Sequence, residues 1–382
     1  MRLSSGAERS SSARAPIALV TSSMDGGGAQ RAVAKLASGM AACGHDVDVV
    51  LGRAAGPYLS ELSPDVRVVD LGARRFAGAV VPLARYLRET RPRAVFSALD
   101  YVNIATVLAR ALSGTGVPLV VSERNTLSQA LARTGTLRAR SMPVLMRWAY
   151  RRADAVAAVS EGVAEDLVRT CRLAPGSVHV LNNPVVTPDM VRLRQEPVSH
   201  PWLREGSLPV VLAVGRLVPQ KDFGLLLEAF AMLRRSHAAR LVILGEGASR
   251  ADLERRAGEL GVAEDVSLPG FCTNPYPAMA AADVFVLCSR WEGSPGVLIE
   301  AMACGAPVVA TDCPSGPRQV LDGGRHGRLV PVGDATALRD GIVDALEGRL
   351  RPPSSEGWTP YEQATVVQAH LDLLGVNASC VG

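Results

Sequence analysis

The chain repeats one pattern along most of its length: a short apolar run followed by a longer stretch with helical periodicity. The runs at 17–22, 47–51 and 66–71 have the length and β-branched content of buried strands, and a helical pattern at 29–42 separates the first two. Strands that alternate with helices pair in parallel, because each helix carries the chain back to the same edge of the sheet. The sequence therefore predicts an α/β fold of parallel strands.

A break in this pattern divides the chain into two series. Residues 184–209 are rich in proline and polar residues, as linkers are, and 382 residues suffice for two domains. We expect two doubly wound domains that face a central cleft, with ligands bound beyond the carboxyl ends of the strands. The expected parts are a disordered tail at 1–15, a first domain at 16–185, a linker at 186–208, a second domain at 209–350, and at 351–382 another linker and a C-terminal helix that can cross back to the first domain. The remaining predicted strands are 94–99, 119–122, 155–159 and 178–181 in the first series, and 210–214, 241–244, 266–268, 284–287, 308–310 and 327–330 in the second.

Composition argues against several classes of protein. No apolar run reaches the roughly 18 residues that cross a bilayer, and the polar start of the chain lacks the apolar core of a signal peptide. The net charge of +4 is too small to indicate nucleic-acid binding. The seven cysteines include no C-x-x-C pair, so we expect free, buried thiols and no zinc site. These features indicate a cytoplasmic protein.

Arginine and apolar residues are interleaved between 124 and 153, where the sequence contains no acidic residue. The Arg-rich segment at 133–152 is the densest part. A basic amphipathic segment of this kind can lie on the anionic inner face of a membrane. It can also form an ordinary surface helix with a solvated arginine face, and the sequence leaves both interpretations open.

Two cations follow the predicted strand at 210–214. Arg216 and Lys221 lie in the loop GRLVPQKD, where Asp222 is a candidate N-cap for the next helix. An arginine that grips two oxygens and a compact lysine charge suit a diphosphate. The alternative is a solvated pair of loop charges. The chain has only two lysines, at 35 and 221, so a lysine at 221 is more informative than another arginine.

The stretch CSRWEGSPGVLIEAMACGAPVVATD follows the predicted strand at 284–287. Ser294 suits the N-cap of a helix and Pro295 its first position, and Gly305 would end that helix. The helix start offers free N–H groups to a phosphate. Glu292 and Glu300 are too far apart along the helix axis to act as a coupled acid pair. We expect them to grip two parts of one elongated ligand, a sugar and a ribose.

Three further glycine or acidic motifs are less specific. GEGASR at 245–250 is an incomplete dinucleotide fingerprint, so a nicotinamide site is not supported. Gly26, Gly27 and Gly28 lie between a predicted strand and a helix, where they allow close approach of a ligand. Asp46 and Asp48 form a D-x-D pair, but at the start of a strand and so at the wrong end of the sheet. We interpret this pair, with His45, as a capped and exposed strand start.

Three segments together resemble the donor domain of glycosyltransferase family 4: GRLVPQKD, NPYPAMAAADVFVL and EGSPGVLIEAMACGAPVVATDCPSGPRQVL. The resemblance covers residues 16–345 and is strongest in the second half. The family consists of retaining enzymes of the GT-B architecture, with two Rossmann-like domains. TDCPSGPRQVL is similar to members that extend lipid-linked or lipopolysaccharide-type glycans with hexoses or N-acetylhexosamines. A nucleotide diphosphate sugar, with UDP as the commonest nucleotide in the family, is the implied donor.

The resemblance implies a role for each matching residue. Arg216 and Lys221 would hold the donor diphosphate, Glu292 the donor sugar and Glu300 the ribose. A protein cation takes the place of a metal, so no metal or other cofactor is implied. The residues implied to surround the donor are Gly27, Gly28, Phe271 (with 269–270, beside the base), Ser294, Pro295, Gly296 and Val297.

The sequence departs from the family pattern at one place. Many members carry a histidine after the strand that matches 119–122, whereas this chain has Ser122, Glu123, Arg124 and Asn125. Either Glu123 or Asn125 could face the anomeric centre or the acceptor, or both could be structural. The activities that stay open beside polysaccharide synthesis are a soluble glycosyltransferase of secondary metabolism, a UDP-sugar 2-epimerase and a catalytically silent donor-binding subunit.

Overall fold

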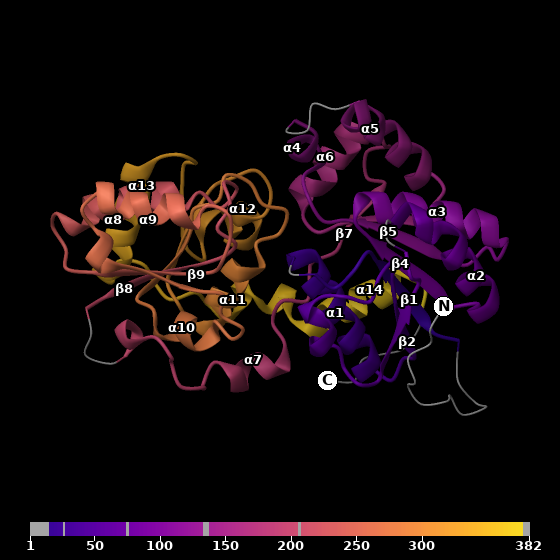
Figure 1. Ribbon diagram of the computed structural model, residues 1–382, viewed down its shortest axis with the longest axis horizontal. Coiled ribbons are helices and arrows are strands. Elements are labelled where there is room, and N and C mark those ends of the chain that lie inside the picture. The colour runs from indigo at the N-terminus through magenta and orange to yellow at the C-terminus, as the bar shows by residue number, and fades with distance from the viewer. Residues whose placement is uncertain (1–14, 26, 74–75, 133–136, 205–207, 377–382) are drawn as a thin grey trace. The chain divides into compact units, whose positions relative to one another are not determined.

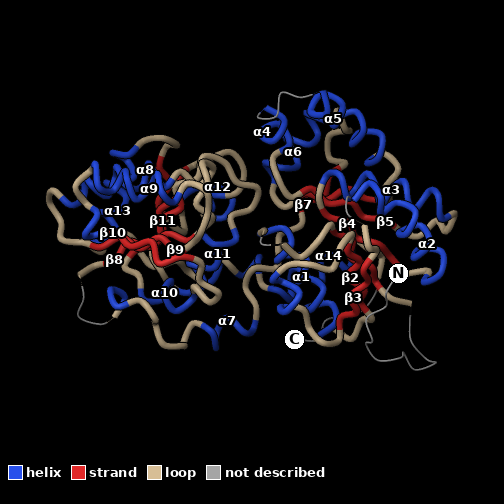
Figure 2. The backbone as a smooth tube through the Cα atoms, in the orientation of Figure 1, coloured by secondary structure: helices blue, strands red, loops and turns tan. Residues whose placement is uncertain are grey.

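The computed structural model describes residues 15–25, 27–73, 76–132, 137–204 and 208–376. The chain divides into two compact units (Figure 1). Unit 1 contains the residues up to Val185 together with those from Tyr361 onward, and unit 2 is Val186–Pro360. Each unit is built around one parallel sheet (Figure 2), as the alternating pattern of the sequence predicts.

The sheet of unit 1 has seven strands in the order β3-β2-β1-β4-β5-β6-β7. Their positions agree with the predicted ones to within one or two residues. The chain runs outward from β1 in one direction and then outward from β4 in the other, which is the doubly wound arrangement. The strands are β1 (Ile17–Thr21), β2 (Val47–Leu51), β3 (Val66–Asp70), β4 (Ala94–Ala98), β5 (Leu119–Glu123), β6 (Ala155–Ala158) and β7 (Val178–Val180).

Alternate side chains of each strand enter two separate cores, one on each face of the sheet. Ala18 and Val20 pack with helices α2, α3 and α5, whereas Ile17 and Leu19 pack with α1 and α14. Because both faces are covered, most residues of these strands are apolar. The helices of unit 1 are α1 (Gly28–Ala42), α2 (Val80–Thr90), α3 (Asp100–Ser113), α4 (Leu127–Ala132), α5 (Leu137–Tyr150), α6 (Glu161–Cys171) and α14 (Gln363–Leu373).

The C-terminal helix α14 lies beside α1, where Figure 1 shows yellow next to indigo. Gly39 of α1 permits this contact, since a Cβ there would lie 2.7 Å from Cγ2 of Val367. The side chain of Gln363 donates to the carbonyl of Lys35 at 2.6 Å, and the Lys35 ammonium donates to the carbonyl of Val185 at 2.8 Å. Residues from both ends of the sequence therefore complete unit 1.

The sheet of unit 2 has six parallel strands in the order β10-β9-β8-β11-β12-β13. Helices α8 and α13 pack on one face, and α10 and α11 contact each other. The strands are β8 (Val210–Val214), β9 (Arg240–Leu244), β10 (Val266–Gly270), β11 (Val284–Leu287), β12 (Val308–Thr311) and β13 (Arg328–Val330). The helices are α7 (Pro188–Leu193), α8 (Phe223–Arg234), α9 (Arg250–Glu259), α10 (Tyr276–Ala281), α11 (Gly296–Cys304), α12 (Pro317–Val320) and α13 (Ala335–Leu346). The short 3₁₀ turns are Pro57–Glu61, Phe76–Ala79, Pro201–Leu203, Ala263–Asp265, Asp322–Gly324, Ser355–Gly357 and Thr359–Tyr361.

The segment expected to be a linker, 186–208, is structured in its described part. It contains α7 and a 3₁₀ turn, and it contacts the body of unit 2. The Asn274 amide donates to the carbonyl of Leu193 at 2.9 Å, and Arg194 donates to the carbonyl of Ala303 at 3.2 Å. Proline at the first helical position starts α7 without losing a hydrogen bond, so the prolines that suggested a linker also begin a helix.

Five cysteines carry free thiols, namely Cys171, Cys272, Cys288, Cys304 and Cys313, and all but Cys272 are buried. The expectation of free thiols is wrong for Cys43, which is disulfide-bonded. Cys380 lies outside the described residues. None of the helices within the described ranges is long and apolar enough to span a membrane.

Candidate functional site

Two loops meet at the point of unit 2 where the strand order reverses. One follows β8 and the other follows β11, and these strands are neighbours in the sheet. Arg290 N–H donates to the carbonyl of Gln220 at 2.9 Å, and the Gln220 side chain donates to the carbonyl of Trp291 at 2.9 Å. The Cys288 thiol donates to the carbonyl of Lys221 at 3.0 Å. Parallel sheets bind ligands beyond the carboxyl ends of their strands. Both loops, with the residues predicted to bind the donor, lie at that end of β8 and β11.

Asp222 precedes α8, as predicted for an N-cap, but its side chain caps nothing. Its backbone is left-handed, with φ of 51°, and its carboxylate accepts two hydrogen bonds from Arg290, at 2.8 Å from Nε and 3.0 Å from Nη2. This fork-like pair is stronger than a neutral cap. It fixes the end of the β8 loop to the β11 loop.

Lys221 and Glu292 form an ion pair inside this junction. The ammonium nitrogen of Lys221 lies 2.6 Å from Oε1 of Glu292, and their side chains are 15% and 8% exposed. The Ser289 hydroxyl donates to the same Oε1 at 2.6 Å. Sequence reasoning gave these two charges to different parts of a ligand and missed their contact, as it missed Ser289. A serine three residues before a glutamate in a loop gives no distinctive signal.

Arg216 is also in the β8 loop, but it is exposed. Within the described ranges no acidic residue pairs with its guanidinium. The junction therefore combines a nearly buried, paired lysine with a solvent-accessible arginine. Two such cations at the carboxyl edge of a parallel sheet can bind an anionic ligand.

Helix α11 starts one residue later than predicted. Pro295, not Ser294, occupies the N-cap position, and Gly296 is the first helical residue. The N–H groups of Leu298 and Ile299 are bound to the carbonyl of Pro295 at 3.0 and 3.4 Å. Gly316 contacts this turn so closely that a Cβ there would lie 2.5 Å from Cδ of Pro295. The helix ends at Gly305, with φ of 94°, as predicted.

Glu300 is buried within α11, and Tyr276 of α10 donates a hydrogen bond to its Oε1 at 3.3 Å. Glu292 lies before the helix, so the two carboxylates have different surroundings. Phe271 follows β10 with 68% of its surface exposed. An exposed aromatic ring at the carboxyl edge of the sheet can stack on a flat ligand group.

The G-x-G at 245–247 serves contacts between loops. A Cβ on Gly245 would lie 1.9 Å from the carbonyl oxygen of Gly215, and one on Gly247 would lie 2.3 Å from that of Leu217. Arg250 donates to Glu246, at 2.6 Å from Nη2, and to the carbonyl of Leu268 at 3.0 Å. The glycines therefore allow the β8 and β9 loops to touch, and this explains the motif without a dinucleotide.

In unit 1, Gly27 precedes α1 and Gly28 is its first residue. A Cβ added to Gly28 would meet nothing within 4 Å, whereas one on Gly27 would meet the Gln30 side chain. Gly26 lies outside the described residues. The open space at Gly28 is compatible with a ligand at the helix start.

The two acceptor-side candidates have opposite environments. Glu123 is buried at the end of β5 and accepts hydrogen bonds from the N–H groups of Arg124 (2.9 Å) and Asn125 (3.4 Å) and from the hydroxyl of Tyr150 (3.1 Å). Burial, and next to it the charge of Asp100, raise the pKa of Glu123 to about 7. Asn125 is exposed. Glu123 therefore supports the loop, and Asn125 is the one open to a ligand.

Arg124, which the sequence did not single out, is buried on the opposite face. Its Nη1 donates to Oδ1 of Asn183, and its guanidinium lies 5.4 Å from the ring centre of Phe96. Burial lowers the pKa of Arg124 to about 10, and burial next to this cation lowers the pKa of His370 to about 3. The sequence signal that could have identified Arg124 is the pair of charged residues, Glu123 and Arg124, at the end of a buried strand.

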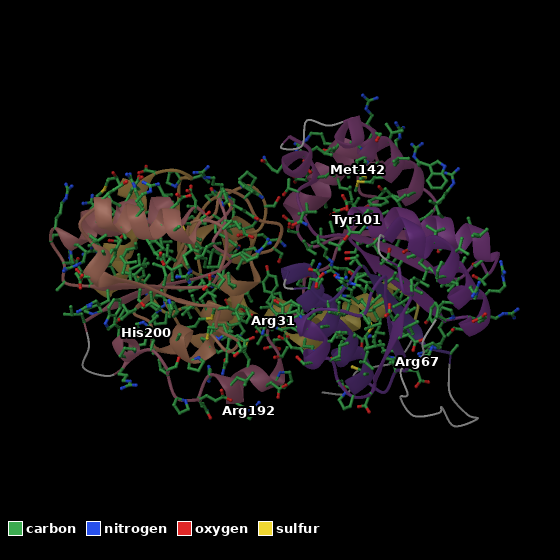
Figure 3. The ribbon with its side chains drawn as sticks, in the orientation of Figure 1. Arg31, Arg67, Tyr101, Met142, Arg192 and His200 are labelled. Atoms are coloured by element: carbon green, nitrogen blue, oxygen red, sulfur yellow. The ribbon has the colours of Figure 1, made fainter. Side chains whose placement is uncertain are left out.

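The structure shows that the prediction of an exposed strand start at the D-x-D pair is wrong for Asp48. Asp48 is fully buried, not exposed, and it pairs with Arg67, which is labelled in Figure 3, and accepts from the Tyr86 hydroxyl at 2.6 Å. His45 is also buried, with Nδ1 3.0 Å from Nη2 of Arg93. A structural ion pair inside unit 1 accounts for Asp48, and its position supports the expectation that the pair is not a metal motif.

The Arg-rich segment 133–152 is described in part. Residues 133–136 lie outside the described ranges, and α5 covers residues 137–150. Apolar side chains are exposed on α5 and on the adjoining α3, which are marked in Figure 3 by Met142 and Tyr101. The exposed apolar residues are Tyr101, Leu108, Leu112, Val144, Leu145 and Trp148, called the α3–α5 surface below.

Two doubly wound parallel sheets, one of them with a cationic junction at its switch point, are typical of proteins that bind an anionic ligand at the loops after the strands. Comparison with known proteins narrows this class. The model described as Glycosyltransferase Family 4 matches residues 26–188, and the one described as Glycosyl transferases group 1 matches residues 208–348. The chain belongs to the family 4 glycosyltransferases, which confirms the resemblance seen in the sequence.

Three similar proteins illustrate this relationship. The chain is 32% identical over 252 residues to the N-acetylgalactosamine-N,N'-diacetylbacillosaminyl-diphospho-undecaprenol 4-alpha-N-acetylgalactosaminyltransferase of Campylobacter jejuni, an alignment that spans 66% of each chain. It is 30% identical to the alpha-D-kanosaminyltransferase of Streptomyces kanamyceticus, over 65% of this chain and 67% of the other. The crystal structure of HepE from Anabaena in complex with UDP superposes with a TM-score of 0.76 at 20% identity, over 95% of this chain and 100% of that one. This likeness confirms the predicted GT-B fold class.

Proposed function

We propose that this chain is a retaining glycosyltransferase. It transfers a hexose or N-acetylhexosamine from a nucleotide diphosphate sugar to a hydroxyl of a glycan or lipid-linked acceptor. The observation that carries the proposal is the Lys221–Glu292 ion pair at the switch point of unit 2, with the exposed Arg216 in the same loop. Cations at this place can neutralise a departing diphosphate, while the carboxylate can bind sugar hydroxyls.

The chemical step needs charge stabilisation more than acid–base chemistry. As the bond from the anomeric carbon to the diphosphate breaks, negative charge grows on the leaving oxygen, and preorganised donors lower the energy of that state. Arg216, Lys221 and the N–H of Val297 at the start of α11 supply such donors, whereas the Gly296 N–H already donates to the carbonyl of Ser294 at 3.0 Å. We propose that these donors serve in place of a metal ion. The acceptor oxygen bonds to the anomeric carbon on the same face from which the diphosphate departs, and the hydroxyl proton passes to the departing diphosphate oxygen.

The other donor contacts follow from the local environments. Glu300 binds the ribose, supported by Tyr276, and Phe271 lies along the base. Ser294 and Pro295 line the sugar. The open space at Gly28, with Gly27 before it, can admit a ligand at the start of α1. Asn125 contacts the acceptor or the reacting sugar, and Glu123 positions its loop. UDP is the first nucleotide to test, because it is the commonest in the family.

The name of the Campylobacter relative supports a lipid-linked glycan as acceptor. The kanosaminyltransferase supports a different acceptor, a small secondary metabolite. A UDP-sugar 2-epimerase of the same architecture is a third possibility, and it differs from both because it needs no acceptor.

One experiment separates transfer to a lipid-linked glycan from epimerisation. The purified protein is screened for thermal shift with UDP-, GDP- and dTDP-sugars, since a ligand at 100 times its Kd stabilises the folded state by about 2.7 kcal/mol. The stabilising donor is then incubated with and without undecaprenyl-diphosphate glycans. Acceptor-dependent release of the nucleotide supports the proposal. Formation of the 2-epimer of the donor sugar without acceptor, either free or as its nucleotide form, supports the epimerase. No shift with any donor contradicts donor binding.

We also propose that the α3–α5 surface contacts an anionic membrane. Val144 and Trp148 are one helical turn apart on α5, as Leu108 and Leu112 are on α3, and Arg147, Arg151 and Arg152 adjoin them in the sequence. Apolar side chains flanked by arginines suit the boundary between headgroups and acyl chains. Such contact would place the protein peripherally where lipid-linked acceptors are found.

A further inference from the structure

Two buried hydroxyl groups lie behind the Lys221–Glu292 ion pair. Ser289 has no exposed surface, and its hydroxyl donates to Oε1 of Glu292 at 2.6 Å, the same oxygen that the Lys221 ammonium contacts at 2.6 Å. Thr311, the last residue of β12, is also fully buried, and its hydroxyl donates to the carbonyl of Ser289 at 2.6 Å. Ser289 therefore connects β12 to the ion pair, because its carbonyl accepts from Thr311 and its hydroxyl donates to Glu292.

We infer that Ser289 and Thr311 are positioning residues that hold Glu292, and through it the Lys221 ammonium, in place before the donor binds. This inference rests on the proposed function of the same site. Neither hydroxyl touches the donor in this assignment. Thr311 fixes the main chain of Ser289 at the bend after β11, and Ser289 then fixes the carboxylate.

The geometry explains why a lysine needs such support. A lysine side chain has four rotatable bonds and a point charge, so it loses much entropy when it is held at one place. Here its carbonyl is fixed by the Cys288 thiol at 3.0 Å and its ammonium by Glu292. An ammonium has three N–H donors. One is used on Glu292, and the others can bind phosphate oxygens without breaking the ion pair.

The Ser289 hydroxyl acts directly on the ion pair, because it binds the same oxygen of Glu292 that the Lys221 ammonium contacts. A carboxylate held by a single flexible cation can rotate about its last bonds, whereas a second donor from the rigid β11 loop fixes one oxygen. Hydrogen bonds to charged groups are the stronger ones in proteins, and more so where water is excluded. The loss of the Ser289 hydroxyl should therefore loosen Lys221 more than it loosens the fold.

Steady-state kinetics test the inference. Ser289→Ala and Thr311→Val should lower kcat, Ser289→Ala by roughly tenfold or more, with the donor KM changed by no more than about twofold. Thr311→Ser keeps the hydroxyl and should retain nearly full kcat. Thr106→Val is the matched control, because Thr106 is a fully buried threonine of α3 whose hydroxyl also donates to a carbonyl, that of Val102. In a Glu292→Gln background, Ser289→Ala should have little further effect on kcat.

Lysine-selective isotope labelling gives a second measurement, of the Lys221 side chain itself, that does not depend on enzyme activity. Because the chain contains only Lys35 and Lys221, a protein labelled with ¹³C at lysine Cε gives two side-chain signals in an NMR spectrum. Ser289→Ala should shift and sharpen the Lys221 signal and leave the Lys35 signal unchanged. Lys221→Arg assigns the two signals.

The outcomes separate the two proposals. A wild-type enzyme that transfers sugar, with kcat and the Lys221 signal unaltered by Ser289→Ala, overturns the positioning role and leaves the function standing. If no nucleotide sugar is turned over, the proposed function fails, and the Lys221 signal still decides whether Ser289 positions the lysine. Circular dichroism would show whether Ser289→Ala and Thr106→Val both lose their fold. In that case kcat of Thr311→Ser and of Thr311→Val is compared, and equal kcat values would overturn the positioning role.

Discussion

The ammonium nitrogen of Lys221 lies 2.6 Å from Oε1 of Glu292, although 71 positions separate the two residues in the sequence. The contact joins the loops after β8 and β11, two strands that are neighbours only because the sheet is doubly wound. The residues proposed to hold the diphosphate and the sugar are thus parts of one hydrogen-bonded unit. The following predictions test this unit and its surroundings.

Lys221→Ala should lower turnover by roughly 10²- to 10³-fold, because it removes a charge-stabilising donor from the site of bond cleavage. The measurement is kcat at saturating donor. Arg255→Ala is the control, since Arg255 is an exposed cation on α9 of the same unit. Near-normal turnover in Lys221→Ala would remove this lysine from the mechanism.

Glu300→Ala should mainly weaken donor binding, with a rise in donor KM of about tenfold that corresponds to one hydrogen bond to a charged group. Tyr276→Phe, which removes the hydroxyl at 3.3 Å from Glu300 Oε1, should show a smaller rise in the same direction. Donor titrations at fixed acceptor measure both effects. An unchanged donor KM in Glu300→Ala would contradict the ribose role.

Asp48→Ala should destabilise the protein by about 3 kcal/mol, because it leaves the Tyr86 hydroxyl and the Arg67 guanidinium without their shared partner. Tyr86→Phe should cost about 1 kcal/mol, as loss of a neutral donor does. Urea unfolding of the full chain, followed by circular dichroism and by the fluorescence of Trp148, Trp202, Trp291 and Trp358, gives both values. A loss of activity without a loss of stability would point to a functional D-x-D pair.

Glu123 should make stability fall as pH rises from about 4.5 to about 7. Its pKa is raised from 4.5 to about 7 by burial, so in this interval the unfolded chain has released a proton that the folded protein still holds. Rising pH therefore favours the unfolded state. The Tm of wild type relative to Glu123→Gln, measured across this interval, should decrease with pH. A constant difference would show that burial does not raise the pKa of this carboxyl.

Trp148→Ser combined with Val144→Ser should weaken binding to vesicles that contain phosphatidylglycerol, because it removes apolar area from the α3–α5 surface. Val191→Ser is the matched control, since Val191 is 55% exposed on α7 of unit 2. Cosedimentation at low and high salt measures the effect, and the arginine contribution should weaken with salt. Equal binding of both variants would exclude this surface as the contact.

Much of the fold was predictable from local patterns. Short apolar runs and helical stretches recur with a period that depends on residues close in sequence, so the strands and the parallel class follow without tertiary information. Gly305 ends α11 as predicted because a left-handed residue after a helix depends on one position alone. The motifs of the second half also indicate the family, because they are short runs of residues that are adjacent in the sequence.

Other features depended on which segments the fold brings together. Asp222 and Ser294 are residue types that favour helix caps. The Asp222 carboxylate instead accepts hydrogen bonds from Arg290, and Ser294 lies one residue before the N-cap position of α11. Asp48 looked exposed because it starts a strand, yet α2 places Tyr86 over it.

The sequence by itself determined the alternating strands and helices, the break between two series and the set of candidate charges, since these depend on nearby residues. Only the tertiary structure decided that Ser289 and Lys221 contact the same carboxylate oxygen of Glu292. It also decided that Glu123 is buried while Asn125 is exposed. The physical reason is that hydrogen bonds and burial depend on distance in space, and strand order at a switch point brings together residues far apart in the chain.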